Sequence, residues 1–306
     1  MEQLPGSPTE VLVALGIESP QKNLGLFYST TFNEFKKMDV NSLKKLGFTA
    51  DQAEVIYDGL RNGTCIRQQR RMGIGFAIAN RLGLDGASVV VSSRKENHVK
   101  EAIKRLEVNG IRCDGCVAHV GKHSDRENLI KFAIERFGRL DILVSNAAVN
   151  PHFGDLMTVN ESQWEKLLEI NVKSAFLLSQ LAVPYLERSG NGNIVFVSSV
   201  AGYAPIDGIG AYSIMKTALL GINRTLSQSL ARRNIRVNAI APGIIRTDFS
   251  KIFTEQREKN IDELIPLGRF GEADECAGAV LFLVSDEASY MTGETIGING
   301  GMHARI

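Results

Sequence analysis

Three residues in the second half of the chain have types and spacing suited to moving a proton to or from an oxygen. Tyr212 and Lys216 lie four positions apart, which places both side chains on one face of a helix, one turn apart. A phenol has a pKa of about 10, and a neighbouring ammonium favours the phenolate and lowers that pKa. Ser199, thirteen residues before Tyr212, closes the run IVFVSS and offers a hydroxyl to a carbonyl. A Tyr-x-x-x-Lys pair alone is common on helix surfaces, but with Ser199 it predicts a general acid–base site for a carbonyl–alcohol pair.

The elements that must position these residues alternate between strands and helices from Gly73 onward. Apolar runs predict strands at 87–94, 113–120, 140–148, 192–202, 235–243 and 293–301, and helical spacing predicts helices at 95–110, 124–138, 162–190, 211–233 and 272–286. We expect Gly110 to follow a helix end and Ser124 to cap a helix start. This alternation favours an α/β, Rossmann-like, doubly wound parallel sheet with helices on both faces. Ligands bind at the carboxyl ends of the strands in such sheets.

Further motifs in the same order resemble the short-chain dehydrogenase/reductase family. Asn171 in EINVKS matches the family's fourth active-site residue, which holds a water in the proton relay. The run SNAA at 145–148 stands where the family has Asn-Asn-Ala-Gly, and RVNAIAPGIIRT matches the segment that lines the nicotinamide. The resemblance runs from about Gly73 to the C-terminus. It implies that Tyr212 donates the proton, Lys216 binds the nicotinamide ribose and Ser199 orients the carbonyl.

The runs VVVSSRK, HVGK, DILVSNAAVNP and ASYMTGETIGINGG are similar to one branch of that family, the peroxisomal NADPH-dependent carbonyl reductases and retinol dehydrogenases. This similarity implies reduction of retinal, aromatic ketones and dicarbonyls, and a homotetramer. The catalytic residues would be Asn171, Ser199, Tyr212 and Lys216. The residues expected to bind the cofactor are Gly73, Ile74, Gly75, Ser93, Arg94, Asn146, Ala147, Tyr212, Lys216, Pro242, Gly243 and Thr247. Between Gly243 and Gly268 the apolar residues Ile244, Ile245, Phe249, Ile252 and Phe253 suggest a hydrophobic carbonyl or alcohol substrate.

The end of the strand predicted at 87–94 bears on the choice of cofactor. A site that prefers NAD usually places Asp or Glu there, because a carboxylate binds the ribose 2′-hydroxyl and repels a 2′-phosphate. Ser93 and Arg94 stand there instead, and a guanidinium binds phosphate with charge-assisted hydrogen bonds. We therefore predict NADP(H). In the alternative interpretation Arg94 and Lys95 only begin a solvated helix, and Glu96 lies close by.

The segment before Gly73 does not match the family pattern. The family has a buried strand ending in Thr-Gly or Thr-Ala, then three residues, then Gly-Ile-Gly. Here Gln68 and Gln69 fall on the Thr-Gly pair, and Arg67 falls where a buried apolar side chain belongs. The first strand of the sheet is therefore in doubt. Three explanations compete. The segment before Gly73 is foreign to the fold, or the run TCIR or AEVIY forms a poor central strand of the sheet. In the third, Arg70 and Arg71 neutralise the pyrophosphate in place of a glycine cradle.

The composition is that of an ordinary globular protein. The chain has 306 residues, 44% of them hydrophobic and 23% charged, and a formal net charge of +1, so no nucleic-acid or membrane-surface partner is indicated. No apolar run reaches the roughly 20 residues of a membrane span, and the N-terminus lacks the pattern of a secretory signal. Cys113-x-x-Cys116 reads as part of a strand, so we expect buried thiols, and no metal site is predicted.

Two domains are expected. Residues 1–62 form an atypical N-terminal extension, partly helical or disordered, and residues 63–306 form the dehydrogenase/reductase domain. The final Ala304-Arg305-Ile306 is similar to a small–basic–aliphatic peroxisomal address, with the cytoplasm as the alternative. The predicted function is NADPH-dependent, reversible carbonyl reduction. The alternative is a catalytically impaired subunit or interaction protein of the same fold, with defective cofactor binding.

Overall fold

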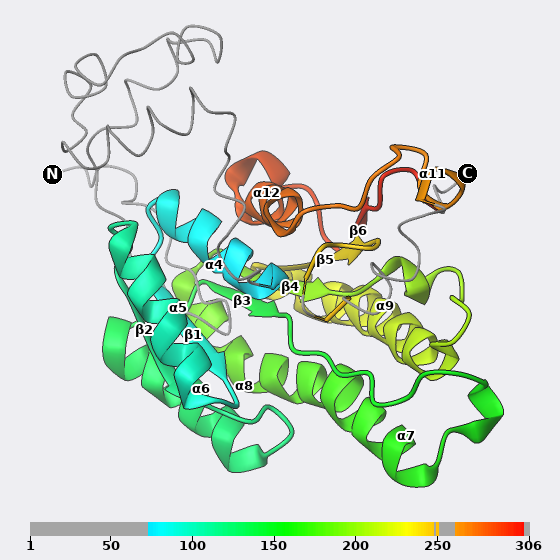
Figure 1. The fold of residues 1–306 in the computed structure, drawn as a ribbon. Coiled ribbons are helices and arrows are strands. Elements are labelled where there is room, and N and C mark those ends of the chain that lie inside the picture. Colours follow the sequence, from blue (N-terminus) through cyan, green and yellow to red (C-terminus); the bar gives the residue numbers. More distant parts are fainter. Residues whose placement is uncertain (1–72, 248, 251–260, 303–306) are drawn as a thin grey trace, which may run out of the picture. The chain divides into compact units, whose positions relative to one another are not determined.

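The structure is a computed structural model, and it describes residues 73–247, 249–250 and 261–302. The predicted extension 1–62 and the segment before Gly73 lie outside the described residues, so the predicted domain boundary stays a prediction. Figure 1 shows the described part as an alternation of strands and helices.

The six strands form two parallel sheets. β1 (Val89–Ser93) pairs with β2 (Cys113–Val117), and β3 (Ile142–Ser145), β4 (Gly192–Val197), β5 (Ile235–Pro242) and β6 (Thr295–Ile298) pair in that order. Each pair is parallel, for example with Val195 opposite Asn238. Among the described residues no strand joins β1 to β3, so the strand that the sequence leaves in doubt is not part of the described fold.

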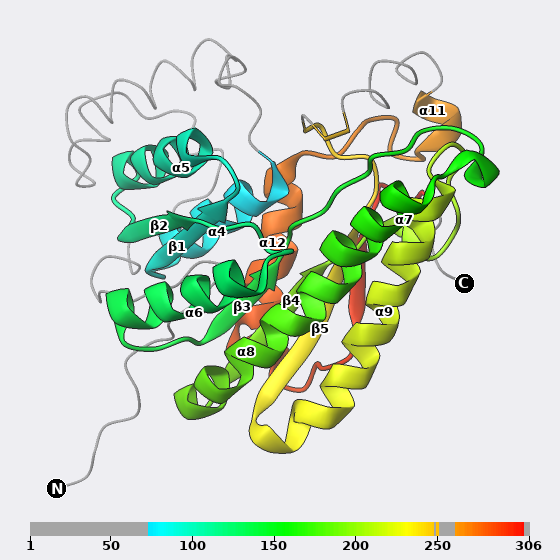
Figure 2. The ribbon, with the colours of Figure 1, turned by 90° about the horizontal axis from the view of Figure 1, so that it is seen from below.

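Helices cover both faces of the four-stranded sheet (Figures 1 and 2). On one face α4 (Ile74–Leu84) packs against α12 (Ala273–Val284), and α12 also contacts β4, β5 and β6. On the other face α8 (Ser174–Ser189) packs on β3 and β4, and α9 (Gly210–Leu230) packs on β5. The remaining α-helices are α5 (Glu96–Val108), α6 (His123–Phe137), α7 (Glu161–Leu168) and α11 (Ile261–Leu264).

One hydrophobic cluster holds the two sheets in a common core. It contains Val89 and Val90 of β1, Leu143 of β3 and Phe196 of β4, all fully buried. Every residue of β4 is buried, as expected for a parallel strand covered on both faces. The predicted α/β, doubly wound architecture with helices on both faces is therefore confirmed.

Most predicted elements agree with the structure, with two local differences. Gly110 follows α5 with a φ of 74°, a left-handed conformation that glycine adopts without strain, as expected for a helix end. α6 begins at His123, one residue before the predicted cap, and the capping position is Lys122, so the prediction for Ser124 is wrong. The Ser124 hydroxyl instead bonds the carboxylate of Asp125.

The second difference lies in the helix predicted at 162–190. A π-helical segment, Glu169–Lys173, separates α7 from α8 and contains Asn171. Such a segment inserts an extra residue into a turn, and it frequently occurs at functional sites. The helix also begins earlier than predicted, because Asn160 and Gln163 form a capping box at its start.

The carboxyl ends of the strands bring the predicted site residues to the same edge of the fold. Ser93 ends β1, Ser145 ends β3, Ser199 follows β4 and Pro242 ends β5.

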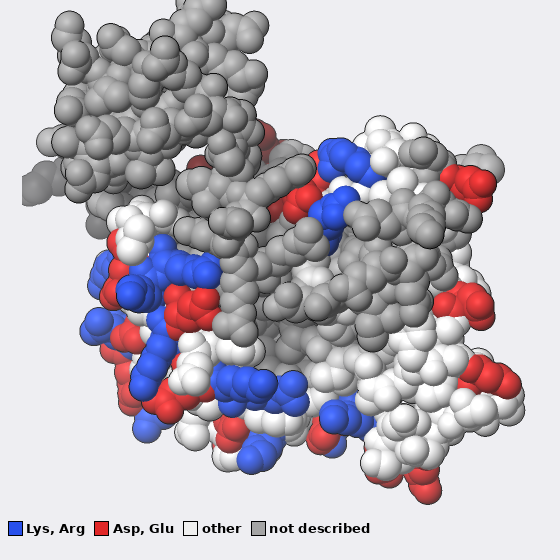
Figure 3. All heavy atoms as spheres, in the orientation of Figure 1, with Lys and Arg blue, Asp and Glu red and all other residues white. Residues whose placement is uncertain are grey.

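On the face of the molecule shown in Figure 3, basic and acidic side chains are interspersed over the region of α5 and α6.

Candidate active site

The turn after β4 and the first turns of α9 bring Ser199, Tyr212 and Lys216 together. Ser199 is the N-cap of a short 3₁₀ helix (Val200–Gly202), and its Oγ accepts a hydrogen bond of 3.1 Å from the backbone N–H of Ala201. The Ser199 side chain also acts on Tyr212, whose pKa it lowers. Tyr212 and Lys216 lie one turn apart on α9, as their spacing predicts. The structure thus brings a half-buried serine together with a buried tyrosine and a buried lysine.

Lys216 is almost fully buried, and its charge is poorly solvated. Its Nζ donates a 2.7 Å hydrogen bond to the backbone oxygen of Val197 and lies 5.4 Å from the centroid of the Tyr212 ring. Burial lowers the pKa of Lys216 to about 7, because the ammonium loses its hydration. Near neutral pH this side chain therefore exists in both protonation states.

Burial also governs Tyr212. It raises the pKa of the phenol well above its usual value, and Ser199 opposes this rise only in part. The expectation that Lys216 lowers the pKa of Tyr212 stays a prediction, because burial outweighs the other influences on this phenol. Tyr212 is consequently protonated at neutral pH, the state required of a proton donor.

Asn171 fixes the loop that follows β3. Its Oδ1 accepts a 3.1 Å hydrogen bond from the N–H of Val149, and its Nδ2 donates to the carbonyl oxygens of Val149 (3.0 Å) and Leu167 (2.9 Å). Both amide hydrogens are thus engaged with backbone, and the side chain retains only acceptor capacity. These hydrogen bonds give Asn171 a positioning role, and its predicted role in holding a water stays a prediction.

The loop that Asn171 holds meets the N-terminus of α4. A Cβ placed on Gly75 would lie 2.6 Å from Nδ2 of Asn146, so this glycine lets the Asn146 side chain approach α4 closely. Ala148 packs against the cluster that contains Tyr212, and Ala147, between Asn146 and Ala148, is exposed. The structure therefore brings Asn146, a predicted cofactor residue, next to the predicted phosphate-binding helix.

Among the described residues, nothing covers the N-terminus of α4. Gly73 is its N-cap without a side-chain cap, a Cβ there would meet no described atom within 4 Å, and the first turn contains no acidic residue. The first N–H groups of a helix, including those of Ile74 and Gly75, lack partners within the helix and attract anions. This end of the fold fits a phosphate group of a dinucleotide.

The residues predicted to read the 2′-position lie at the end of β1. Ser93 is half-buried, and Arg94 is exposed and makes no hydrogen bond or ion pair within the described residues. The carboxylate of Glu96, the residue that left the cofactor in doubt, lies 2.6 Å from the ammonium of Lys100. Glu96 is therefore paired along its own helix and does not occupy the Arg94 guanidinium.

The segment after β5 forms a wall of the candidate site. The N–H of Gly243, which follows Pro242, donates a 2.9 Å hydrogen bond to Ile298, and a Cβ on Gly243 would lie 3.0 Å from the Cα of Asn299. Thr247 is buried, and its N–H donates to the Ser250 hydroxyl over 3.1 Å. The predicted lining residues Ile252 and Phe253 lie outside the described residues.

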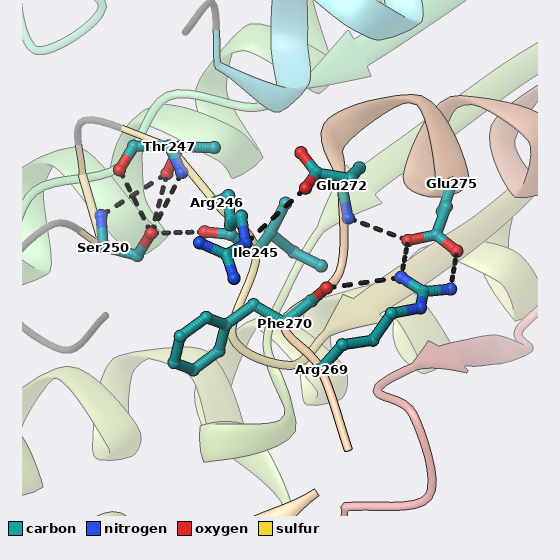
Figure 4. Close-up of polar contacts among 8 residues, drawn as sticks. All are labelled: Ile245, Arg246, Thr247, Ser250, Arg269, Phe270, Glu272 and Glu275. Carbon is teal, nitrogen blue, oxygen red and sulfur yellow. Dashed lines mark hydrogen bonds and ion pairs between the residues drawn. The ribbon is translucent and has the colours of Figure 1, made fainter. Parts of the chain in front are cut away.

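Two features of this wall were not evident from the sequence pattern. The Phe249 ring centroid lies 6.0 Å from that of Tyr212, and about half of the Phe249 side chain is exposed. Figure 4 shows the second, a set of polar contacts that join Arg246 to Glu272 and Arg269 to Glu275. A signal for the second existed, since Glu272 and Glu275 have the spacing of a capping box ahead of an apolar helix.

The expectation of buried thiols is met only in part, because Cys113 and Cys116 are half-buried. Burial raises the pKa of both Cys113 and Cys116 to about 11, and the two lie three positions apart on β2. Within the part of the chain that the structure describes, no group of three His, Cys, Asp or Glu residues could hold a metal. No helix in that part is both long and apolar enough to cross a membrane.

Comparison with known proteins matches most of this chain to reductases and dehydrogenases. The family model described as enoyl-(acyl carrier protein) reductase matches residues 69–303. Over 251 residues the chain is 48% identical to dehydrogenase/reductase SDR family member 4 of Pongo abelii, covering 81% of this chain and 90% of that relative.

Two solved structures have a similar fold. One is 7α-hydroxysteroid dehydrogenase complexed with NADH and 7-oxo glycochenodeoxycholic acid (TM-score 0.72, 32% identity, covering 76% of this chain and 90% of that one). The other is a variant of actinorhodin polyketide ketoreductase with NADPH (TM-score 0.72, 28% identity, covering 76% of this chain and 94% of that one).

Proposed function

The chain belongs to the short-chain dehydrogenase/reductase family, and from that premise we propose that it reduces hydrophobic carbonyl compounds to alcohols with NADPH. The observation that carries this proposal is the meeting of Ser199, Tyr212 and Lys216, in which Nζ of Lys216 lies 5.4 Å from the centroid of the Tyr212 ring and Ser199 acts on the phenol. Retinal, aromatic ketones and dicarbonyls are the substrate classes that the family branch suggests.

The residues of the chain divide the proton chemistry between them. Ser199 orients the carbonyl oxygen next to Tyr212. Because its pKa is raised, Tyr212 holds its proton until negative charge develops on that oxygen, and it then donates the proton from Oη. Ser199 and Lys216 stabilise the phenolate that results, and Lys216 can return the proton because its own pKa lies near neutrality. The bound cofactor supplies the hydride to the carbonyl carbon.

The described residues fit a dinucleotide. The open N-terminus of α4 and the contact between Gly75 and Asn146 suit a pyrophosphate, and Arg94 suits a 2′-phosphate. Structural relatives are complexed with NADH in one case and NADPH in the other, so the family binds both dinucleotides. Our preference for NADPH rests on Arg94 and on the absence of a carboxylate at the end of β1.

The substrate side of the site is apolar. Phe249 lies beside Tyr212 and is half exposed, and Ile206 packs against the apolar cluster that contains Tyr212. An apolar group attached to the carbonyl carbon would cover that ring and remove it from water. This arrangement supports hydrophobic carbonyl compounds as the substrate class.

The first test is a titration of the full-length protein with NADPH and NADH, followed by ketone reduction. We expect tighter binding of NADPH, turnover with NADPH, and a loss of about 10²–10⁴-fold in kcat for Tyr212→Phe, which removes the proton donor but keeps the ring. Unchanged reduction by Tyr212→Phe would contradict the mechanism. Binding of NADH equal to that of NADPH would contradict the cofactor preference.

A second candidate is an impaired subunit that keeps the fold without binding the cofactor. It is favoured by the sequence before Gly73, where Gln68 and Gln69 stand in place of the family's Thr-Gly pair. The same titration decides between the two, because turnover by the full-length chain excludes this candidate, whereas failure to bind either dinucleotide supports it.

A homotetramer and a peroxisomal location complete the proposal. The first rests on the family branch and the second on Ala304-Arg305-Ile306, which lie outside the described residues. Light scattering of the purified protein gives the oligomeric state. Imaging of a fluorescent fusion at the N-terminus, with Arg305→Glu as the control, tests the C-terminal address.

A further inference from the structure

The segment that carries Thr247 and Phe249 is joined to the start of α12 by a short parallel bridge. The N–H of Arg246 donates a 2.8 Å hydrogen bond to Gly271, and the N–H of Gly271 donates a 3.0 Å bond to Ile244. A Cβ on Gly271 would lie 2.5 Å from Cδ1 of Ile245, so the Ile245 side chain packs directly over this glycine. This bridge connects a wall of the site to an element that carries none of the predicted site residues.

The Arg246 side chain adds a second connection at the same place (Figure 4). Its guanidinium carbon lies 4.9 Å from the ring centroid of Phe270, and its Nε lies 3.6 Å from Oε1 of Glu272. Phe270 is fully buried, so the guanidinium stacks on a ring that cannot move away. Phe270 also belongs to the apolar cluster that contains Val200, the residue after Ser199.

Glu272 is itself fixed. As the N-cap of α12 it forms a reciprocal capping box with Glu275, whose carboxylate accepts two hydrogen bonds from Arg269 at 2.9 and 2.6 Å. The Arg269 guanidinium and the N–H of Glu272 lower the pKa of Glu275 to about 2. The carboxylate that Arg246 approaches therefore belongs to an ordered, charged helix start.

On the other side of Arg246 the chain turns back on itself. Ser250 Oγ donates to the carbonyl of Ile245, and the hydroxyls of Thr247 and Ser250 lie 3.2 Å apart. This turn directs Phe249 towards Tyr212. A change in the position of Arg246 would therefore reach both Thr247 and Phe249 through a few bonds of backbone.

We propose that Arg246 is a positioning residue for the cofactor-binding and substrate-binding wall: its guanidinium, stacked on Phe270 and paired with Glu272, holds Thr247 and Phe249 in register with Tyr212. The inference rests on the proposed function, because the wall matters for catalysis only if the site binds NADPH. Arg246 acts through its neighbours, so its loss changes affinity more than the chemical step.

The test compares Arg246→Gln and Arg246→Lys with the unmodified full-length protein. We expect Arg246→Gln to raise the Kd and KM for NADPH about tenfold, within the range of a buried cation–π contact, and to change kcat by less than about twofold. Arg246→Lys keeps the positive charge opposite Glu272 but not the planar stack on Phe270. Its Kd and KM for NADPH should therefore lie between those of the unmodified protein and those of Arg246→Gln. Arg233→Gln is the control, because Arg233 pairs with Glu187 on α8, away from the site.

A second measurement does not depend on the cofactor. Hydrogen exchange of the amides in 244–250 should accelerate several-fold in Arg246→Gln, because the bridge to Gly271 opens more often, while exchange in β5 stays unchanged. Binding and exchange as in the unmodified protein would overturn the inference. An Arg246→Lys variant no better than Arg246→Gln would overturn the pairing with Glu272.

A loss of kcat by the same factor as affinity, together with a lower Tm, would indicate general damage and would also overturn the inference. If the unmodified protein binds neither dinucleotide, the proposed function fails, and the exchange comparison alone decides the role of Arg246.

Discussion

Lys216 lies against the aromatic face of Tyr212, with its Nζ 5.4 Å from the ring centroid, while its hydrogen bond goes to the backbone oxygen of Val197. The two side chains are therefore in contact but do not bond each other. Burial acts on both, lowering the pKa of Lys216 and raising that of Tyr212. Each neutral form is favoured, so the free site is poised to donate a proton from Tyr212.

The depressed pKa of Lys216 predicts a particular dependence of stability on pH. The folded-state pKa is about 7, whereas an unfolded lysine titrates near 10.5. Between these values the unfolded chain binds more protons, so Lys216 makes the free energy of unfolding rise with pH from 7 towards 10.5.

We expect Lys216→Met to flatten this rise, and urea unfolding at pH 7, 8 and 9 measures it. The comparison stops at pH 9 because Cys113 and Cys116, with pKa values raised to about 11, contribute with the opposite sign above that pH. Parallel curves for the two proteins would show that Lys216 is charged in the fold.

The contact between Gly75 and Asn146 predicts a difference between two glycines. Gly75→Ala places a methyl 2.6 Å from Nδ2 of Asn146, so this side chain must shift, and we expect weaker NADPH binding. Gly73→Ala meets nothing within 4 Å among the described residues and should affect NADPH binding less. NADPH titration of both variants makes the comparison, and equal affinity of the two would contradict it.

The hydrogen bonds of Asn171 predict a large structural effect. Asn171→Ala removes three bonds to buried backbone, at a net cost of about 0.5–1.5 kcal/mol each, and we expect a total loss of about 2–4 kcal/mol. Asn193→Ala is the matched control, since Asn193 is equally buried and its side chain donates one bond, to Asn191. Urea unfolding should rank the two variants in that order, and the reverse order would refute the positioning role.

The exposed guanidinium of Arg94 predicts a change of cofactor preference. Arg94→Ala should raise the Kd for NADPH by about tenfold or more, because a charge-assisted bond to the 2′-phosphate is lost. The Kd for NADH should stay within about twofold of that of the unmodified protein. Arg81→Ala, at the other end of α4, is the control for a general loss of positive charge. An equal loss of affinity for both dinucleotides would mean that Arg94 does not read the 2′-position.

The sequence by itself determined the fold class, the order of the strands and helices from Gly73 onward, and the residues that meet at the strand ends. These features follow from local patterns, because period, apolar runs and turn residues are properties of neighbouring positions. The spacing of Tyr212 and Lys216 on one helix is of this kind, and so is the strand-end position of Ser199.

Only the tertiary structure decided what surrounds those residues. Burial of Tyr212 raises its pKa, a shift that the sequence does not predict, and burial depends on segments far apart in the chain. The π-helical turn at Asn171 and the stacking of Arg246 on Phe270 likewise arise from contacts between distant segments. A pattern can place a residue on an element, but desolvation and close contact exist only once the elements have packed.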